Sequence, residues 1–168
     1  MPRLALVVTH GVSARHLLKG QLSYLQRSGF AVTVIASPGA DLDHVAARDS
    51  VQVVGVPMSR EIDLARDATA LLRLVRVLRA VRPEIVNVGT PKAGLLGSLA
   101  AAIARVPVRI YTLRGLHLEG ARGGLRRVLR ATERVAVASA HRVVCVSESL
   151  RRRFLEERLC PAGKTLVL

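Results

Sequence analysis

The sequence predicts an α/β fold built on a parallel β-sheet. Short β-branched apolar runs alternate with helical patterns throughout the 168 residues. The strand segments are almost continuously apolar, as expected for strands that are covered on both faces. The connections between segments are short, which favours βαβ units over hairpins. Together these three observations predict one domain, residues 1–168, with a doubly wound sheet of about six to seven strands.

The first half of the chain contains four predicted strands and two predicted helices. The first helix is expected to end at Gly29, and the second at Arg82 because Pro83 follows it. In the second helix Leu64, Ala68, Leu71, Val75 and Leu78 share one face, with Arg66, Arg73 and Arg76 opposite. The strands are predicted at 4–8, 31–36, 51–56 and 85–88, and the helices at 13–28 and 64–82.

The second half continues the alternation. Residues 93–104 form a helix that is apolar all round and rich in small residues, so it should lie buried close against the sheet. The remaining helices are predicted at 125–140 and 149–159, and the strands at 108–113, 142–146 and from 165 onward. A strand that runs directly to Leu168 suggests that the chain is one part of a longer protein.

The chain is strongly basic, with 26 Lys and Arg against 12 Asp and Glu, a formal charge of +14. Residues 85–168 carry 15 basic and 5 acidic side chains. Such a balance indicates an anionic partner, either a phosphorylated substrate, a membrane surface or nucleic acid, although a coding bias toward Arg would produce it too. Aromatic residues make up only 2% and no recognition motif is present, so nucleic acid is not expected as a partner.

Several function classes are excluded by missing patterns. The longest apolar stretch, 93–104, falls short of the roughly 20 residues of a spanning helix, and the N-terminus does not resemble a signal peptide. Cys145 and Cys160 form neither a CxxC motif nor a Cys/His cluster. A nucleotide-hydrolysing P-loop, a dinucleotide fingerprint and a GxSxG elbow are absent as well. A reducing, cytoplasmic location is therefore expected.

Ligands of parallel sheets bind at the carboxyl ends of the strands. His10 and Gly11 follow the first strand, and the loop of residues 57–61 follows the third. The loop of residues 89–94 leads into a helix N-terminus beside Lys92, which suits either an anion site or simply a tight turn. His10 could contact substrate or have only a structural role.

Two further loops carry polar groups at the same edge. Arg114, Gly115 and His117 follow the fifth strand, where an Arg beside a Gly could bind a phosphate or a sugar hydroxyl. Glu148 follows Ser147 after the sixth strand and could accept from a sugar hydroxyl or stabilise the next helix. The 125–140 helix places Arg126, Arg127, Arg130 and Arg134 on one face, which suits anionic lipid headgroups or a solvated surface.

Four of these stretches, taken in order and spacing, resemble family 4 (group 1) glycosyltransferases. They are residues 56–62, 82–97, 106–115 and 141–149. The chain is most similar to bacterial enzymes that build cell-surface polysaccharides on a polyprenyl-diphosphate lipid. The resemblance implies the N-terminal, acceptor-side lobe of a GT-B fold, with two Rossmann-like lobes facing across a cleft. The C-terminal lobe, which would bind the donor, is not in this chain, so the chain alone is expected to be inactive.

The resemblance also assigns residues. It implies substrate binding by the matched loops and catalytic roles beside the reacting sugar for Arg114 and His117, where many family members carry a His at the position of Arg114. The implied substrate-binding residues are His10, Gly11, Ser13, Arg60, Glu61, Thr90, Lys92, Gly115, Ser147 and Glu148.

The implied reaction retains anomeric configuration and needs no metal or other cofactor. Its expected partners are a nucleotide-sugar donor, a lipid-linked or saccharide acceptor and an anionic membrane surface at which the protein lies peripherally. The alternative is a stand-alone Rossmann-like module that binds a phosphorylated ligand without catalysis.

Overall fold

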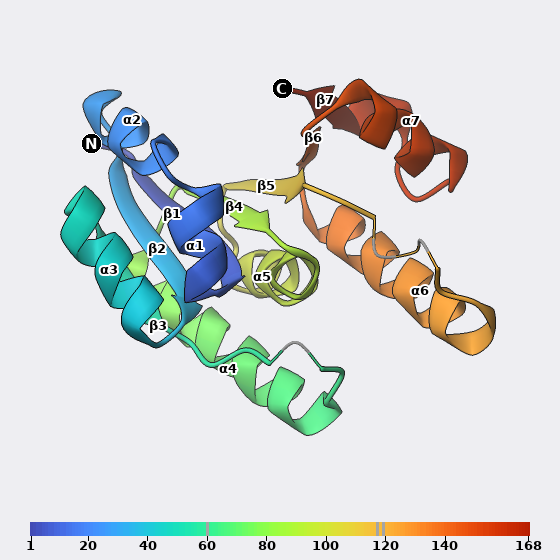
Figure 1. Cartoon of the computed structure of the whole chain (residues 1–168), viewed down its shortest axis with the longest axis horizontal. Helices are drawn as coiled ribbons and strands as arrows, with labels where there is room; N and C mark the ends of the chain where they lie inside the picture. Colours follow the sequence, from blue (N-terminus) through green and yellow to red (C-terminus); the bar gives the residue numbers. More distant parts are fainter. Residues whose placement is uncertain (60, 117, 119) are drawn as a thin grey trace.

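The computed structural model describes residues 1–59, 61–116, 118 and 120–168. This part of the chain forms a seven-stranded sheet in which every neighbouring pair is parallel, in the order β3-β2-β1-β4-β5-β6-β7 (Figure 1). The doubly wound parallel sheet predicted from the sequence is thereby confirmed. The strands are β1 (Arg3–His10), β2 (Ala31–Ser37), β3 (Gln52–Gly55), β4 (Ile85–Gly89), β5 (Val108–Leu113), β6 (Arg142–Cys145) and β7 (Thr165–Val167).

The helices differ from the prediction in two places. The helix expected over 13–28 is two helices, because the chain turns at Gly20, which has a positive φ of 78°. A helix over 40–49 was not expected at all. The helices are α1 (Gly11–Leu17), α2 (Gln21–Arg27), α3 (Ala40–Asp49), α4 (Leu64–Val81), α5 (Pro91–Ile103), α6 (Gly123–Ser139) and α7 (Glu148–Glu156), with a 3₁₀ turn, η1, at Ala162–Lys164.

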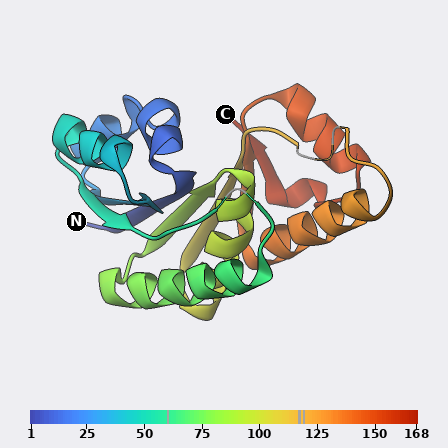
Figure 2. The same cartoon turned by 60° about the horizontal axis from the view of Figure 1, so that its bottom comes forward.

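Two apolar clusters hold the helices to the sheet. One packs α1, α2 and α3 against β1 and β2 through residues such as Leu6, Leu22 and Val34. The other joins α4, α5, α6 and α7 to strands of the sheet, with Leu74 and Phe154 among its fully buried side chains. Figure 2 shows α1–α3 and the pair α4 and α5 on opposite sides of the sheet. The larger of the two clusters therefore lies beneath α4–α7.

Helix α5 confirms the prediction of a buried helix rich in small residues. A Cβ placed on Gly97 would lie 2.8 Å from Cγ1 of Val88, and one on Gly94 would lie 2.6 Å from Cε2 of Tyr111. Both distances are too short for ordinary contact, so glycine is what allows this helix to approach β4 and β5. The short approach fixes where the N-terminus of α5 lies at the edge of the sheet.

The predicted buried face of α4 is partly wrong. Ala70, Leu74, Val75 and Leu78 are buried, whereas Leu64 is 83% exposed. Ala68 is exposed as well and Leu71 is only half-buried, so of the five residues predicted for the apolar face only Val75 and Leu78 are fully buried. The opposite face, with Arg66, Arg73 and Arg76, is exposed as predicted.

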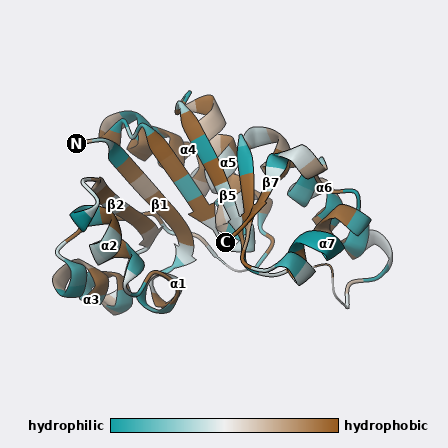
Figure 3. Ribbon diagram, turned by 90° about the horizontal axis from the view of Figure 1, so that it is seen from above, coloured by the Kyte–Doolittle hydropathy of each residue, from teal (hydrophilic) through white to brown (hydrophobic). Residues whose placement is uncertain are grey.

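The basic face of α6 is also only partly as expected. Arg126 and Arg130 both form ion pairs with Glu157, beyond the end of α7, while Arg127 and Arg134 are exposed. Figure 3 shows the strands largely in the colour of apolar residues and α7 largely in that of polar ones. Within the described residues, no helix combines the length and apolar character needed to cross a membrane.

Candidate functional site

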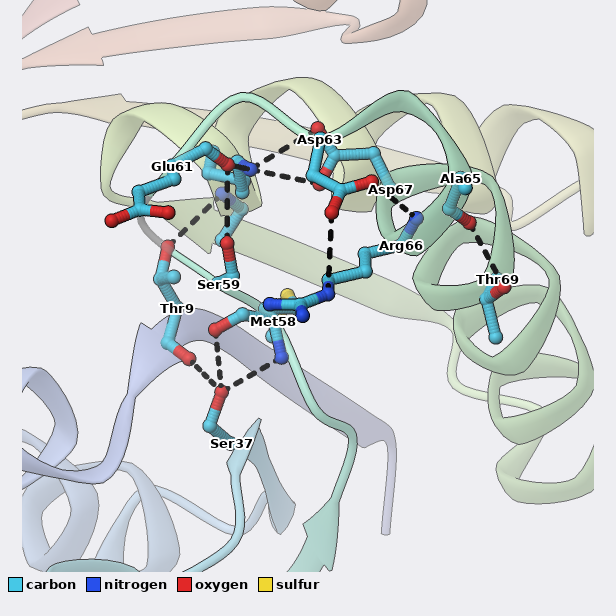
Figure 4. A network of polar contacts seen from close by, with 12 residues as sticks. Thr9, Ser37, Met58, Ser59, Glu61, Asp63, Ala65, Arg66, Asp67 and Thr69 are labelled. Carbon is cyan, nitrogen blue, oxygen red and sulfur yellow. Dashed lines mark hydrogen bonds and ion pairs between the residues drawn. The ribbon is translucent and has the colours of Figure 1, made fainter.

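The candidate site lies where the parallel strands end, and Ser37 at the end of β2 ties three segments together there. The Ser37 hydroxyl lies 2.8 Å from the carbonyl oxygen of Thr9 and 3.0 Å from that of Met58, and it accepts from the Met58 N–H at 2.9 Å (Figure 4). A hydroxyl can satisfy both a donor and an acceptor in this way. The loop after β3 is therefore fixed against the ends of β1 and β2.

Thr90 makes the corresponding connection between β1 and β4. Its hydroxyl accepts from the Thr9 N–H at 3.1 Å and lies 2.7 Å from the Thr9 hydroxyl, which in turn accepts from the Ala93 N–H at 3.3 Å. Thr90 has a φ of 74°, a conformation that is costly for a β-branched residue. The hydroxyl contacts hold the residue in this conformation, so Thr90 shapes the loop as well as lining the edge.

Lys92 is placed at the same edge but its amino group already has partners. Its Nζ lies 2.8 and 3.1 Å from the two carboxylate oxygens of Asp67 and donates to the carbonyl oxygen of Glu61. The Lys92 and Asp67 side chains are only 13% and 19% exposed. A substrate-binding role for Lys92 stays a prediction, and its visible role is to join α5 to the start of α4.

A pocket of about 680 Å³ opens between the loop after β3 and the first turns of α4. Its wall is apolar at Pro38 and Met58, while Arg66 and Arg73 are exposed residues at its side. Asp63 forms the N-cap of α4 and accepts from the Arg66 N–H at 3.0 Å. The lining residues are His10, Ser37, Pro38, Pro57, Met58, Ser59, Ala65, Arg66, Thr69, Ala70 and Arg73.

A second hollow of about 490 Å³ lies beside the pocket, between α1 and α3. His10, Ser37 and Pro38 line both, so His10 lies between the two spaces. Gly11 is buried in the first turn of α1, and a Cβ there would lie 2.8 Å from the backbone nitrogen of Leu42. Glycine is thus required here for α1 to pack against α3.

Arg114 and Gly89 meet at the ends of β5 and β4. A Cβ on Gly89 would overlap Nη1 of Arg114 and lie 3.4 Å from its Cζ. Arg114 is half-buried, and burial lowers the pKa of its guanidinium from the ordinary value. Gly115, by contrast, has open space where a side chain would stand.

The remaining predicted site residues lie farther along the edge. Ser147 is the N-cap of α7 and accepts from the Leu150 N–H at 3.2 Å. Glu148 is exposed in the first turn of α7, where a negative charge is favourable, and it pairs with Arg151 at 3.0 Å; its contact with a sugar hydroxyl stays a prediction. Ser13 is half-buried within α1 and Glu61 is exposed. Arg60 and His117 lie outside the described residues.

The described residues contain no cluster of three or more His, Cys, Asp or Glu side chains placed to hold a metal ion. The expectation that neither a metal nor another cofactor is needed remains a prediction.

Comparison with known sequences decides the family. The sequence model of Glycosyltransferase Family 4 matches residues 17–168 of the chain. The chain belongs to this family. One curated relative is the capsular polysaccharide biosynthesis glycosyltransferase CapM of Staphylococcus aureus, which is 37% identical to this family 4 chain over 152 residues. The matched residues are 90% of this chain and 39% of CapM.

A second relative is the Escherichia coli UDP-Gal:alpha-D-GlcNAc-diphosphoundecaprenol alpha-1,3-galactosyltransferase. It is 32% identical over 100 residues, which are 58% of this chain and 26% of the relative. The chain thus spans about two fifths or less of the length of these curated relatives.

Solved structures share the fold of this family 4 chain. Anabaena Alr3699/HepE in complex with UDP and glucose matches with a TM-score of 0.71 at 17% identity, over 100% of this chain and 44% of the other. MurG of Acinetobacter baumannii matches with a TM-score of 0.64 at 16% identity, over 99% and 45%. The fold is therefore one Rossmann-like lobe of the GT-B type, as the resemblance implied.

Sequence reasoning missed several residues of the pocket. Ser37 gave no motif, and Met58 was included only as part of the loop of residues 57–61, because the contact between them depends on a turn and a loop that meet only in three dimensions. Arg66 and Arg73 were placed on the exposed face of α4, and the only signal for more was that this helix follows a loop at the carboxyl edge. The structure shows that this face borders the pocket.

Proposed function

We propose that this chain is the acceptor-side lobe of a retaining glycosyltransferase that transfers a sugar from a nucleotide-sugar to a lipid-linked saccharide. The acceptor would carry a polyprenyl diphosphate, in the synthesis of a cell-surface polysaccharide. The observation that carries the proposal is the pocket of about 680 Å³ at the carboxyl edge of a lobe that belongs to Glycosyltransferase Family 4. The two relatives, one a capsular polysaccharide glycosyltransferase and one acting on a diphosphoundecaprenol-linked sugar, support this acceptor class.

The lining of the pocket suits a molecule with both polar and apolar parts. Pro38 and Met58 offer apolar contact, while the Ser59 and Thr69 hydroxyls, which donate to backbone carbonyl oxygens, can still accept from sugar hydroxyls. Arg66 lies on the side of α4 that borders the same space. A saccharide next to a phosphate would find complementary groups along this wall.

The chain's own residues would bind and orient the acceptor. Because the Ser37 hydroxyl fixes the loop after β3, this wall of the pocket is held in place before the acceptor arrives. The nucleotide-sugar would be presented by a second lobe, and the nucleoside diphosphate would leave between the lobes. The purified 168-residue chain is therefore expected not to turn over nucleotide-sugar.

Acceptor binding can be tested on the chain itself. The probe is N-acetylglucosamine linked by diphosphate to farnesol, a short version of the acceptor in the name of the Escherichia coli relative. We expect it to shift backbone NMR resonances around the pocket, and Arg73→Ala to weaken binding about fivefold or more, the loss of one charge-assisted contact.

The matched control is Arg76→Ala, which removes the same charge one turn along α4, at an exposed residue that does not line the pocket. It should leave binding unchanged. Absence of binding, or an equal effect of the two variants, would contradict the proposed acceptor site.

We propose in addition that α6 faces an anionic membrane surface. Arg127 and Arg134 are exposed on this helix together with Val128 and Val135, which are 48% and 42% exposed. A basic residue near an anionic bilayer contributes about 1 kcal/mol. In flotation assays the chain should bind vesicles containing phosphatidylglycerol but not those of phosphatidylcholine alone, and Arg127→Glu with Arg134→Glu should abolish binding. Equal flotation with both lipids would rule the surface out.

A further inference from the structure

The half-buried arginines of the described chain form a natural comparison set. Six arginines are neither fully buried nor fully exposed, and five of them donate to carboxylate, carbonyl or hydroxyl oxygens. The sixth, Arg114, makes no hydrogen bond or ion pair with any described residue. The five with partners are Arg48, Arg109, Arg126, Arg130 and Arg151.

This difference is not explained by exposure. Arg126 has a side chain that is 38% exposed and still forms an ion pair with Glu157. A guanidinium has five N–H donors, and removing it from water without supplying acceptors is unfavourable. The partial burial of Arg114, which lowers its pKa, thus has a cost that no described residue offsets. An acceptor from outside the chain would offset it.

The position of the guanidinium is set by Gly89. Because Gly89 has no Cβ, Nη1 of Arg114 can rest directly above its Cα at the end of β4. Gly89 is buried and its φ is not positive, so neither a turn nor backbone strain requires glycine here. The close approach to Arg114 is the one requirement for glycine that the structure shows at this position.

The surroundings select the kind of ligand. Arg114 directly follows β5. Gly89 precedes Thr90, whose hydroxyl is hydrogen-bonded to Thr9 at the same edge of the sheet as the pocket. A planar guanidinium binds the oxygens of a phosphate through two parallel hydrogen bonds, a geometry that a Lys ammonium cannot reproduce. Among the described residues, no carboxylate forms an ion pair with Arg114. An incoming anion would therefore displace no carboxylate of the described residues.

We propose that Arg114 binds a phosphate group of a diphosphate-bearing substrate and that Gly89 is the residue that positions its guanidinium. This inference rests on the proposed function and adds the group that Arg114 recognises. The phosphate has two sources in that function, the lipid diphosphate of the acceptor and the nucleoside diphosphate of the donor. Both present the same oxygens to the guanidinium, and the experiment separates them.

The test measures the Arg114 side chain directly. The chain is labelled with ¹⁵N, the Nε–H signal of Arg114 is assigned by its loss in Arg114→Lys, and inorganic pyrophosphate is titrated at 0.15 M salt. We expect this signal to shift, and Arg114→Lys and Gly89→Ala each to weaken binding by about tenfold, as for the loss of a bidentate charged pair. Arg76→Ala, an equal loss of charge at an exposed site on α4, should change affinity less than twofold.

Gly89→Ala is informative because the atom that its methyl group would meet is the end of a flexible side chain. The guanidinium should move aside while the fold persists, which a urea unfolding curve and a backbone NMR spectrum check. Arg114→Lys keeps the charge and the stem, so it tests the proposal independently should Gly89→Ala unfold. An unmoved Nε–H signal, or equal effects of Arg114→Lys and Arg76→Ala, would overturn the proposal.

Two organic probes identify the source. Farnesyl diphosphate represents the acceptor and UDP the donor, and Arg114-dependent binding of either supports the proposal and assigns its source. Binding of neither through Arg114 would overturn it. If the farnesyl-linked saccharide binds with sensitivity to Arg73 while neither a diphosphate acceptor nor UDP binds through Arg114, this inference fails and the proposed function stands. If the saccharide does not bind at all, the proposed function fails.

Discussion

The two ends of the sheet differ in how their faces are covered. On one face Leu6 of β1 and Val34 of β2 lie opposite each other and are 2% and 0% exposed, beneath α1–α3. The same face continues across β6 and β7, where Val144 and Leu166 are paired, yet Val144 is half-buried and Leu166 is 52% exposed. On the opposite face of β5 and β6, Tyr111 and Val143 are 1% and 0% exposed. The first strands are thus covered on both faces and the last strands on one.

This difference shows that a continuously apolar strand does not by itself establish burial on both faces. The segments around Ile110 and Val144 are as apolar as that around Val34, but no described helix covers the face on which they lie. Burial depends on where the crossover helices pass, which follows from strand order.

Truncation of paired positions should give the largest contrast. Leu6→Ala removes a buried side chain between β1 and its helices and should lower the free energy of unfolding by about 2–5 kcal/mol. Leu166→Ala, on the uncovered face, should cost no more than about 0.5 kcal/mol. Urea unfolding of both variants measures the contrast, and similar losses would show that the last strands are covered in solution.

The covered face of β5 can be probed through Glu133 of α6. Its carboxylate oxygens lie 3.2 and 3.3 Å from the hydroxyl of Tyr111, and burial raises the pKa of Glu133 to about 7, against a smaller lowering by that hydrogen bond. Burial and the neighbouring Glu133 also raise the pKa of Tyr111. The carboxyl group is therefore protonated in the folded chain at pH values where it is ionised in the unfolded chain.

The sign of the pH effect follows from the proton count. Between about pH 4.5 and 7 the folded state holds a proton that the unfolded state has lost, so stability should fall as pH rises and level off above 7. The total change is on the order of 3 kcal/mol at most. Glu133→Gln should remove most of this slope in urea unfolding curves, whereas the exposed Glu156→Gln should retain it. A slope that persists in Glu133→Gln would mean that α6 does not seal this face.

The smallest expected effect compares two helical glycines. Gly94 of α5 faces the ring of Tyr111, so Gly94→Ala should lower the free energy of unfolding by about 1–2 kcal/mol, overpacking outweighing the gain in helix propensity. Gly124 in the first turn of α6 has no atom within 4 Å of an added Cβ, and Gly124→Ala should raise stability by about 0.5 kcal/mol. Thermal unfolding measures whether each variant gains or loses stability. A loss of stability in both variants would show that α6 packs as closely against its neighbours as α5 does.

The fold was predictable where the sequence pattern was local and strong. The strands and α5 follow from apolar runs and small residues that need no partner to be identified. Helix α3 was missed because only Leu42, Val45 and Asp49 of its ten residues are buried, which leaves little periodicity. The polar contacts of Arg126 and Arg130 depend on Glu157, 31 and 27 residues away, so spacing along α6 could not separate them from Arg127 and Arg134.

The candidate site was predictable as an edge of the sheet but not as a set of contacts. Topology alone brings the ends of β1, β2 and β4 together. It does not show that Lys92 pairs with Asp67 while Arg114 has no partner among the described residues, since both cations lie just beyond the carboxyl end of a strand. Burial and partner assignment distinguish the two cations, and these require coordinates.

The contact between Gly89 and Arg114 also limits which residues related chains can carry at these two positions. Any residue larger than glycine at position 89 would occupy the space of the guanidinium, so the two positions form a steric pair across β4 and β5. In an alignment of relatives the pair should covary: an Arg at the second position should be accompanied by glycine at the first, and a shorter or ring-shaped side chain should release that restriction. A substitution history of this family would then record which ligand group each lineage binds at the end of β5.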